Sequence, residues 1–186
     1  VDSQPPYIVN VQPKINSSAV YANSIIQANF NEAVNAVAAA GVVSVTNGVI
    51  NQNSWKNAYI RKNDDNKIIS GRWEISNEFK TIEFIPDTPC AMPAGQTVNS
   101  CGLVPYCLPT LSELSVLVKA ALTDSSGATT SVLSGINDAA GNSLDGGANN
   151  GLRRNGEANG RPADDQDQFV DVDTNDNFFW KVNTSS

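Results

Sequence analysis

The residues with the clearest capacity for chemistry are aspartates near the end of the chain. Residues 164–177 contain six aspartates and no basic residue. Calcium takes about six to eight oxygen ligands, and alternating Asp and Asn side chains can place several oxygens on one side of a turning loop. The spacing predicts a calcium site, with a solvated acidic loop as the competing interpretation. Its candidate ligands are Asp171, Asp173, Asn175 and Asp176.

A further aspartate, Asp138, has two interpretations. It opens the segment Asp138-Ala-Ala-Gly141-Asn142, whose residue types suit a tight turn in which Gly141 takes a positive φ and the Asp138 side chain bonds backbone amides. The alternative is that Asp138 is another cation ligand, shared with the acidic loop.

The three cysteines, Cys90, Cys101 and Cys107, fall in one short stretch, and their odd number leaves at least one unpaired within the chain. Cys101 and Cys107 flank five residues and are expected to close a small disulfide loop in an oxidising compartment, although Cys90 can compete for either partner. Free thiols are one alternative. A zinc site is another, but it needs a fourth ligand and the spacing matches no familiar zinc pattern.

The chain contains no histidine, and this absence disfavours catalysis. Nucleophile systems built on serine or cysteine with histidine cannot be assembled from these residues alone. A glycosidase pair of Glu32 with an aspartate requires a carboxylate separation that the sequence does not set. We expect Glu32 to anchor backbone N–H groups where a strand ends, and we expect no enzyme.

Charge and hydropathy exclude other classes. The formal net charge is −7 and the pI is near 4.4, which disfavours a nucleic-acid partner because phosphates need clustered positive charge. No apolar run reaches the length of a membrane helix, so no membrane insertion is expected. No signal-peptide pattern opens the chain. We therefore expect a mature or excised fragment of a longer chain, with residues 1–4 as a linker.

Short segments with period-two hydrophobicity, separated by turn residues, predict an all-β fold. In residues 24–31, Ile26, Ala28 and Phe30 share one face, and Asn47-Gly48 marks a hairpin. An Ala-rich segment, residues 32–41, predicts one or two helical turns ended by Gly41. The pattern indicates a β-sandwich of about seven to eight strands. The predicted strands cover residues 7–11, 24–31, 42–46, 58–62, 67–75, 81–85, 114–122 and 178–182.

Four short signatures stand in order along the chain: residues 5–13, residues 30–34, residues 81–95 and residues 135–142. Together they resemble the bacterial Ig-like domain family of the surface-layer-protein type. The resemblance covers roughly residues 4–144 and residues 178–182. It implies a seven-stranded immunoglobulin-like sandwich of the kind found in tandem in adhesins, surface-layer proteins and secreted enzymes. Two segments depart from the family pattern: residues 90–109 are longer than usual, and residues 143–177 form an insertion.

The aromatic residues allow a core or a binding surface. Trp55, Tyr59 and Trp73 lie in neighbouring predicted strands and are expected in or near the core; the alternative is a platform that stacks on sugars. Phe179 and Trp180 alternate on the last strand, so one is expected to be buried and the other partly exposed.

These observations predict one immunoglobulin-like domain over residues 1–186, with a long Gly/Asn/Asp-rich acidic insertion at residues 143–177 and a closing strand and tail at residues 178–186. We expect an extracellular or cell-surface, non-catalytic structural or adhesive module of a bacterial surface, appendage or secreted protein, stabilised by calcium. Its partners would be neighbouring domains or subunits of a surface assembly, or a host or glycan ligand. The alternative is a carbohydrate-binding accessory domain of a secreted hydrolase.

Overall fold

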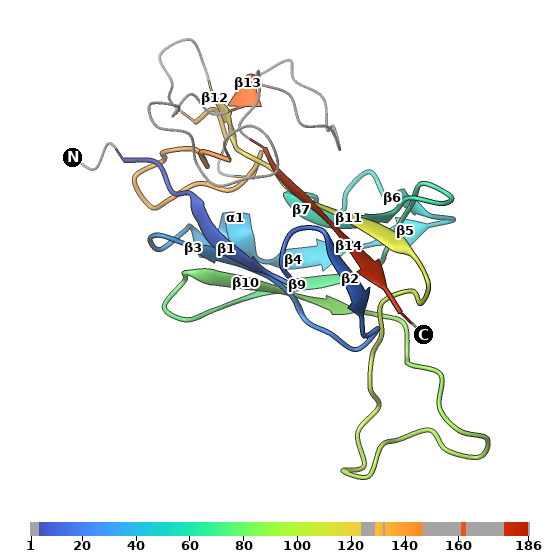
Figure 1. The fold of residues 1–186 in the computed structure, drawn as a ribbon. Helices are drawn as coiled ribbons and strands as arrows, with labels where there is room; N and C mark the ends of the chain where they lie inside the picture. The colour runs from blue at the N-terminus through green and yellow to red at the C-terminus, as the bar shows by residue number, and fades with distance from the viewer. Residues whose placement is uncertain (1–3, 124–128, 132, 147–160, 163–176, 186) are drawn as a thin grey trace.

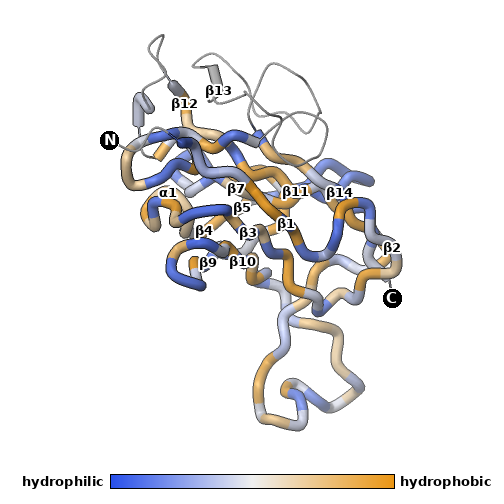
Figure 2. Tube along the Cα trace, turned by 60° about the vertical axis from the view of Figure 1, so that its left-hand side comes forward, coloured by the Kyte–Doolittle hydropathy of each residue, from blue (hydrophilic) through white to orange (hydrophobic). Residues whose placement is uncertain are grey.

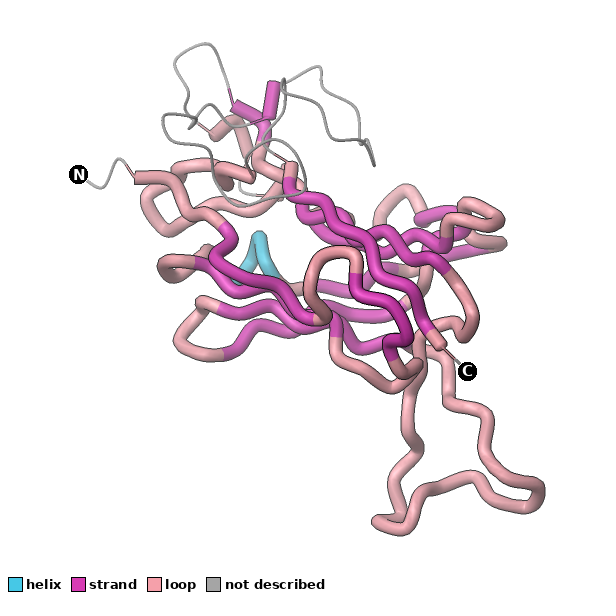
Figure 3. The backbone as a smooth tube through the Cα atoms, in the orientation of Figure 1, coloured by secondary structure: helices cyan, strands magenta, loops and turns pink. Residues whose placement is uncertain are grey.

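Two five-stranded sheets lie face to face and enclose the core (Figures 1 and 3). The computed structural model describes residues 4–123, 129–131, 133–146, 161–162 and 177–185. Within these residues the one helix is the single turn α1 (Ala36–Ala39). The regular secondary structure of the described residues is therefore almost entirely β-strand.

Every neighbouring pair in the first sheet is antiparallel. Its strands, in spatial order, are β1 (Ile8–Gln12), β3 (Ile26–Phe30), β10 (Thr81–Pro86), β9 (Gly71–Ser76) and β4 (Gly41–Val43).

The second sheet combines one parallel pair, β2 with β14, with three antiparallel pairs. Its strands, in spatial order, are β2 (Ser17–Val20), β14 (Phe178–Thr184), β11 (Glu113–Val118), β7 (Ala58–Lys62) and β8 (Lys67–Ile68). Two small ribbons complete the described strands. They are β5 (Val45–Thr46) with β6 (Val49–Ile50), and β12 (Leu122–Thr123) with β13 (Arg161–Pro162).

The strand order matches the immunoglobulin arrangement. In that fold strands A, B, E and D form one sheet and strands C, F and G form the other. Here β1, β3, β10 and β9 occupy the first set of places, and β7, β11 and β14 occupy the second. The immunoglobulin-like sandwich predicted from the sequence is confirmed. The sheets hold ten strands instead of seven or eight because β2, β4 and β8 each add a short edge strand.

Local patterns were reliable where one face of a strand is buried. Ile26, Ala28 and Phe30 are buried on β3, with less buried residues between them. Asn47 and Gly48 both have positive φ angles, 52° and 83°, and connect β5 to β6 as a tight hairpin. The predicted helical turn also forms.

Some predicted boundaries were wrong. Residues 67–75 do not form one strand, because the chain leaves the second sheet after β8 and enters the first as β9. The helix ends before Ala40, and Gly41 begins β4 instead of capping it. A β-carbon at Gly41 would lie 2.3 Å from the Trp55 ring, so a side chain here would displace that tryptophan.

The expectation for the last strand also needs correction, because Phe179 and Trp180 are both buried. Trp180 pairs with Val116 on the inner face of the second sheet. Phe179 lies opposite Leu117, which in turn pairs with Tyr59 on the other face. These three residues form a buried apolar cluster on the outer face, so the period-two pattern does not separate a core side from a solvent side here.

Glu113 connects three adjacent strands of the second sheet. Its Oε1 accepts hydrogen bonds from Asn63 Nδ2, after β7, and from Lys181 Nζ on β14, the latter at 3.2 Å. The Asn63 hydrogen bond, followed by the Lys181 hydrogen bond, lowers the pKa of Glu113 below its usual value. The folded state therefore favours the charged carboxylate.

This depressed pKa predicts acid sensitivity. The stabilisation is complete above the pKa of an unfolded glutamate, about 4.3, and is lost as the pH falls through the lower folded-state pKa. In Glu113→Gln the decline of the unfolding free energy below about pH 4.3 should be shallower than in the wild type. Urea unfolding across this pH range measures it. Asn63→Ala should flatten the profile in the same direction, and an unchanged profile in both variants would contradict the assignment.

Candidate functional site

The connection between β10 and β11 is a long loop without charged residues. Residues 88–112, here called the disulfide loop, contain no Asp, Glu, Lys or Arg, whereas 17% of the whole chain is charged. The loop extends from one end of the sandwich, near the C-terminus and away from the N-terminus (Figure 1). In Figure 2 it is mostly orange and pale, with little blue.

A disulfide joins Cys90 to Cys107 across the base of this loop, with their Cα atoms 4.8 Å apart. Backbone hydrogen bonds bring the two arms together: Cys90 N–H donates to the Pro105 carbonyl and Cys107 N–H donates to the Thr88 carbonyl, both at 2.9 Å. The base of the loop is therefore closed covalently and by hydrogen bonds.

The expected pairing of Cys101 with Cys107 was wrong, and the competing partner Cys90 takes its place. Cys101 lies at the far end of the loop with a free, exposed thiol. Asn99 holds this tip, because its Oδ1 accepts hydrogen bonds from Cys101 N–H at 2.9 Å and Leu103 N–H at 3.0 Å. Pairing follows the register of the two arms and not the shorter sequence spacing.

The base of the loop is attached to the β2–β3 connection and to β14 of the second sheet. Leu108 is buried, and its N–H donates to the Ala22 carbonyl at 2.8 Å. On β14, Thr184 Oγ1 donates to the Pro109 carbonyl at 2.6 Å and accepts from Ser112 N–H at 3.0 Å. The base of the loop is thus held firmly against the sandwich, and the rest of the loop projects from it.

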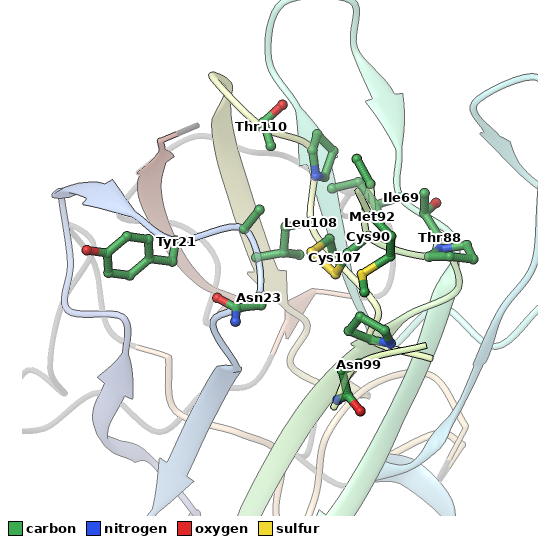
Figure 4. Close-up of a pocket in the computed structure, with 15 residues that line it drawn as sticks. Tyr21, Asn23, Ile69, Thr88, Cys90, Met92, Asn99, Cys107, Leu108 and Thr110 are labelled. Carbon is green, nitrogen blue, oxygen red and sulfur yellow. A yellow bond between two sulfur atoms is a disulfide. The ribbon is translucent and has the colours of Figure 1, made fainter. Parts of the chain in front are cut away.

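A pocket of about 850 Å³ lies where the disulfide loop meets the connection between β2 and β3 (Figure 4). Its walls come from Tyr21, Ala22 and Asn23, from Ile69, and from both arms of the loop, including the disulfide. No lining residue carries a carboxylate or an amine. Such a site suits an uncharged, partly apolar ligand surface.

Several large apolar side chains of the disulfide loop and of residues 21–25 are exposed to solvent. We call the disulfide loop together with residues 21–25 the apolar end. Leu111 is 74% exposed and has a positive φ of 50°, so the backbone holds a bulky side chain outward in an unfavourable conformation. The exposed large apolar residues here are Tyr21, Ile25, Val98, Leu103, Val104, Tyr106 and Leu111.

The turn predicted around Asp138 is present. Asp138 is buried; its Oδ1 accepts from Asn142 N–H at 2.8 Å and its Oδ2 accepts from Asn142 Nδ2 at 2.7 Å. Gly141 has a φ of 89°. Asp138 therefore has the structural role predicted for it. The other calcium candidates, Asp171, Asp173, Asn175 and Asp176, lie outside the described residues.

Within the described part of the chain, no three Cys, Asp or Glu side chains are close enough together to hold a metal ion. Nothing helical in that part has the length and hydropathy of a membrane span.

The other candidate residues do not assemble into a binding surface among the described residues. Trp73 and Tyr59 are buried and Trp55 is half-buried against the core, which confirms the core interpretation over the sugar platform. At the end of β3, the backbone N–H of Tyr7 donates to Asn31 Oδ1 at 2.6 Å, and Glu32 accepts from Asn31 Nδ2 at 3.2 Å. Asn31 thus anchors the Tyr7 backbone, and Glu32 in turn holds the Asn31 side chain.

Sequence reasoning singled out the longer cysteine stretch but missed Tyr21, Leu111 and the pocket. A usable signal was present in the 25 consecutive uncharged residues from Thr88 to Ser112 of an acidic chain.

Comparison with known families agrees with this architecture. The pattern of a bacterial Ig-like domain matches residues 2–99. The chain belongs to the bacterial Ig-like domain family. The match includes the first arm of the disulfide loop and ends near its tip. No curated protein sequence matches the chain.

Two solved structures are similar to this Ig-like chain. One is the N-terminal part of the bacterial S-layer protein SbsC, with a TM-score of 0.39 and 13% identity, covering 76% of this chain and 22% of that one. The other is the S-layer protein rSbsC(31-844), with a TM-score of 0.38 and 14% identity, covering 76% of this chain and 12% of that one. The chain thus spans less than a quarter of the length of either.

The disulfide should contribute measurably to stability. It joins residues 17 apart in sequence, and closing a loop of this size contributes about 3 kcal/mol in the chain-entropy description. Replacing both Cys90 and Cys107 by Ser should lower the unfolding free energy by about this amount, measured by urea unfolding without reductant.

The matched control for this experiment is Cys101→Ser, which removes only the exposed thiol and should change the unfolding free energy by less than about 0.5 kcal/mol. A loss of about 3 kcal/mol in Cys101→Ser would instead show that Cys101 is itself a disulfide partner.

Proposed function

We propose that this protein is a non-catalytic structural or adhesive module of a bacterial cell-surface or secreted protein, and that its apolar end is the docking surface. The observation that carries this proposal is the uncharged, disulfide-anchored loop with its pocket and exposed apolar side chains. Exposed apolar groups on a soluble domain mark interaction sites when they are contiguous. The immunoglobulin-like frame suits this role because it holds end loops on a rigid support.

Two further observations support an extracellular location and a binding role. A disulfide persists in oxidising compartments such as the cell surface, and Cys90–Cys107 is such a bond. The pocket offers amide and hydroxyl groups, among them Asn23 and Thr110, beside an apolar floor that includes Leu108. These groups recognise and orient a partner surface, and they provide no nucleophile with an adjacent base.

The free thiol of Cys101 provides a test in the bacterium that produces the protein. A membrane-impermeant maleimide should modify Cys101 on intact cells, because the module is at the surface. The reaction should be slower than with the purified protein, because a docked partner covers the loop. Labelling is followed by mass spectrometry of the loop peptide, and Cys101→Ser supplies the background.

Two outcomes of the labelling test would contradict the proposal. Labelling that requires cell lysis would place the module away from the surface. Labelling on intact cells at the rate of the purified protein would show that the loop is uncovered.

Calcium stabilisation by the late aspartates belongs to this proposal as a separate step. Its support is the density of carboxylates and amides in residues 164–177. A ligand that binds only the folded state raises stability by mass action, by about 2.7 kcal/mol at a hundredfold excess over its Kd. Bound calcium would neutralise part of the negative charge of this segment.

Thermal unfolding in calcium and in chelator tests this step. Calcium should raise the Tm by several degrees, and the double variant Asp171→Ala/Asp173→Ala should lose the increase. The control Asp64→Ala/Asp65→Ala removes two carboxylates from the β7–β8 turn and should keep it. A wild-type Tm that is the same in both buffers would leave the solvated acidic loop as the correct interpretation.

A further inference from the structure

A row of three apolar side chains crosses the outer face of the second sheet. Leu117 on β11 lies opposite Phe179 on β14 and Tyr59 on β7, and the three are 0%, 7% and 5% exposed, respectively. Val116 and Trp180, their neighbours along β11 and β14, point toward the first sheet. Because side chains alternate between the two faces of a strand, the first sheet is not what covers this row.

The other described strands and the helix lie away from this row. Helix α1 contacts β9 of the first sheet, and β6 contacts β8 at one edge of the second sheet. The β12–β13 ribbon lies beyond the end of β11 (Figure 1). Among the described residues, the outer side of β11 and β14 is therefore a sheet face without a packed strand or helix.

Cationic side chains flank the apolar row on both sides. Two residues from Leu117 in one direction is Lys119, which is 5% exposed. Two residues in the other direction is Ser115, which lies between Arg61 and Lys181 on the neighbouring strands. Burying an ammonium group is unfavourable unless an anion or hydrogen-bond acceptors accompany it. This face therefore suits an acidic segment with an apolar centre.

The chain contains such a segment between β13 and β14. Residues 163–176 contain six aspartates and no basic residue, and their large apolar residues fall within positions 169–172. In an extended chain, alternate residues share one face, which places Phe169 between Asp167 and Asp171. The carboxylate, aromatic ring and carboxylate then repeat at the same two-residue spacing as the cations and the apolar row of the sheet.

Both ends of this segment are fixed near the same end of β11. Pro162 pairs with Thr123, and Asn177 Oδ1 accepts a hydrogen bond from Ala120 N–H at 2.9 Å. Thr123 and Ala120 are three residues apart, which is about 11 Å at most, whereas the 14 residues of the segment can span about 45–50 Å. The apolar row begins two residues beyond Asn177, about 7 Å along β14. The row is therefore within easy reach of the middle of the segment.

Charge favours this face over the loops at the same end of the sandwich. Those loops carry the buried carboxylates Asp138 and Asp145. Without a bound cation, they repel a segment with six aspartates, whereas Lys119, Arg61 and Lys181 attract it.

We propose that residues 163–176 dock on the outer face of the second sheet, with Phe169 on the apolar row and aspartates beside Lys119 and Lys181. This inference is separate from the docking surface of the proposed function, and it does not require calcium. Its consequence is that the chain itself occupies this face, which is then closed to other domains.

Zero-length cross-linking tests the ion pairs in the unmodified protein. A water-soluble carbodiimide activates a carboxylate, and a lysine amine in contact with it then forms an amide, with the net loss of one water. In calcium-free buffer, mass spectrometry of the digested protein should find amides that join Lys119 or Lys181 to aspartates of residues 163–176. The positive control is the described ion pair of Lys67 with Asp65, whose charged atoms lie 3.1 Å apart.

A substitution at the centre of the segment tests the apolar contact. Phe169→Ala should lower the yield of these cross-links several-fold and leave the Lys67–Asp65 link unchanged. It should also lower the Tm by on the order of 5 °C or more, because it removes a buried aromatic ring. The matched control Leu152→Ala removes a large apolar side chain from the other part of the insertion and should change neither quantity.

Three results would overturn the inference. The first is the absence of cross-links between residues 163–176 and Lys119 or Lys181 when the Lys67–Asp65 link forms. The second is a Phe169→Ala variant with the cross-link yields and the Tm of the wild type. The third is linkage of the segment to Lys14 or Lys56 as efficiently as to Lys119, which would show that the segment has no fixed site on the sheet.

Discussion

The fit between the inner faces of the two sheets is the constraint on which the rest of the molecule depends. Trp73 from one sheet and Trp180 from the other are almost wholly buried, and Trp73 contacts Phe84 in a tilted arrangement with ring centroids 5.3 Å apart. Neither buried indole N–H has a hydrogen-bond partner within the described structure, at a cost of about 1–3 kcal/mol each. Burying an aromatic side chain contributes roughly 4–6 kcal/mol, so packing outweighs that cost.

Because this core holds the strands together, the loops at the ends of the sandwich do not have to contribute many side chains to it. The disulfide loop is the clearest case. Ordering a connection of 25 residues with little secondary structure costs conformational entropy. The Cys90–Cys107 disulfide, buried Leu108 and hydrogen bonds to Thr184 offset this cost. Its remaining side chains are free to form a surface. Their lack of charge on an acidic domain makes that surface suited to a neutral partner.

Predictions from sequence succeeded where residues close together in the chain determine the local structure. The alternation on β3, the Asn47-Gly48 hairpin and the turn around Asp138 follow from side-chain period and from turn geometry, which act over a few residues. They failed where contacts between segments distant in sequence determine the structure. The Phe179 side chain is buried opposite Leu117, on a strand distant in sequence, so the alternation of its own strand does not set its exposure. The pairing of Cys107 depends on the register between two loop arms, and spacing along the chain does not reveal that register.

By itself, the sequence determined the class of molecule: an all-β, acidic, histidine-free domain of the Ig-like family. Composition and period indicated most of the strands and the residue types that the chain lacks. Only the tertiary structure decided that the chain changes sheet between β8 and β9, that Cys90 and not Cys101 is oxidised, and that Tyr21 joins the disulfide loop to enclose a pocket. The physical reason is that these features are contacts between segments far apart in the chain, which form only once the two sheets close on a shared core.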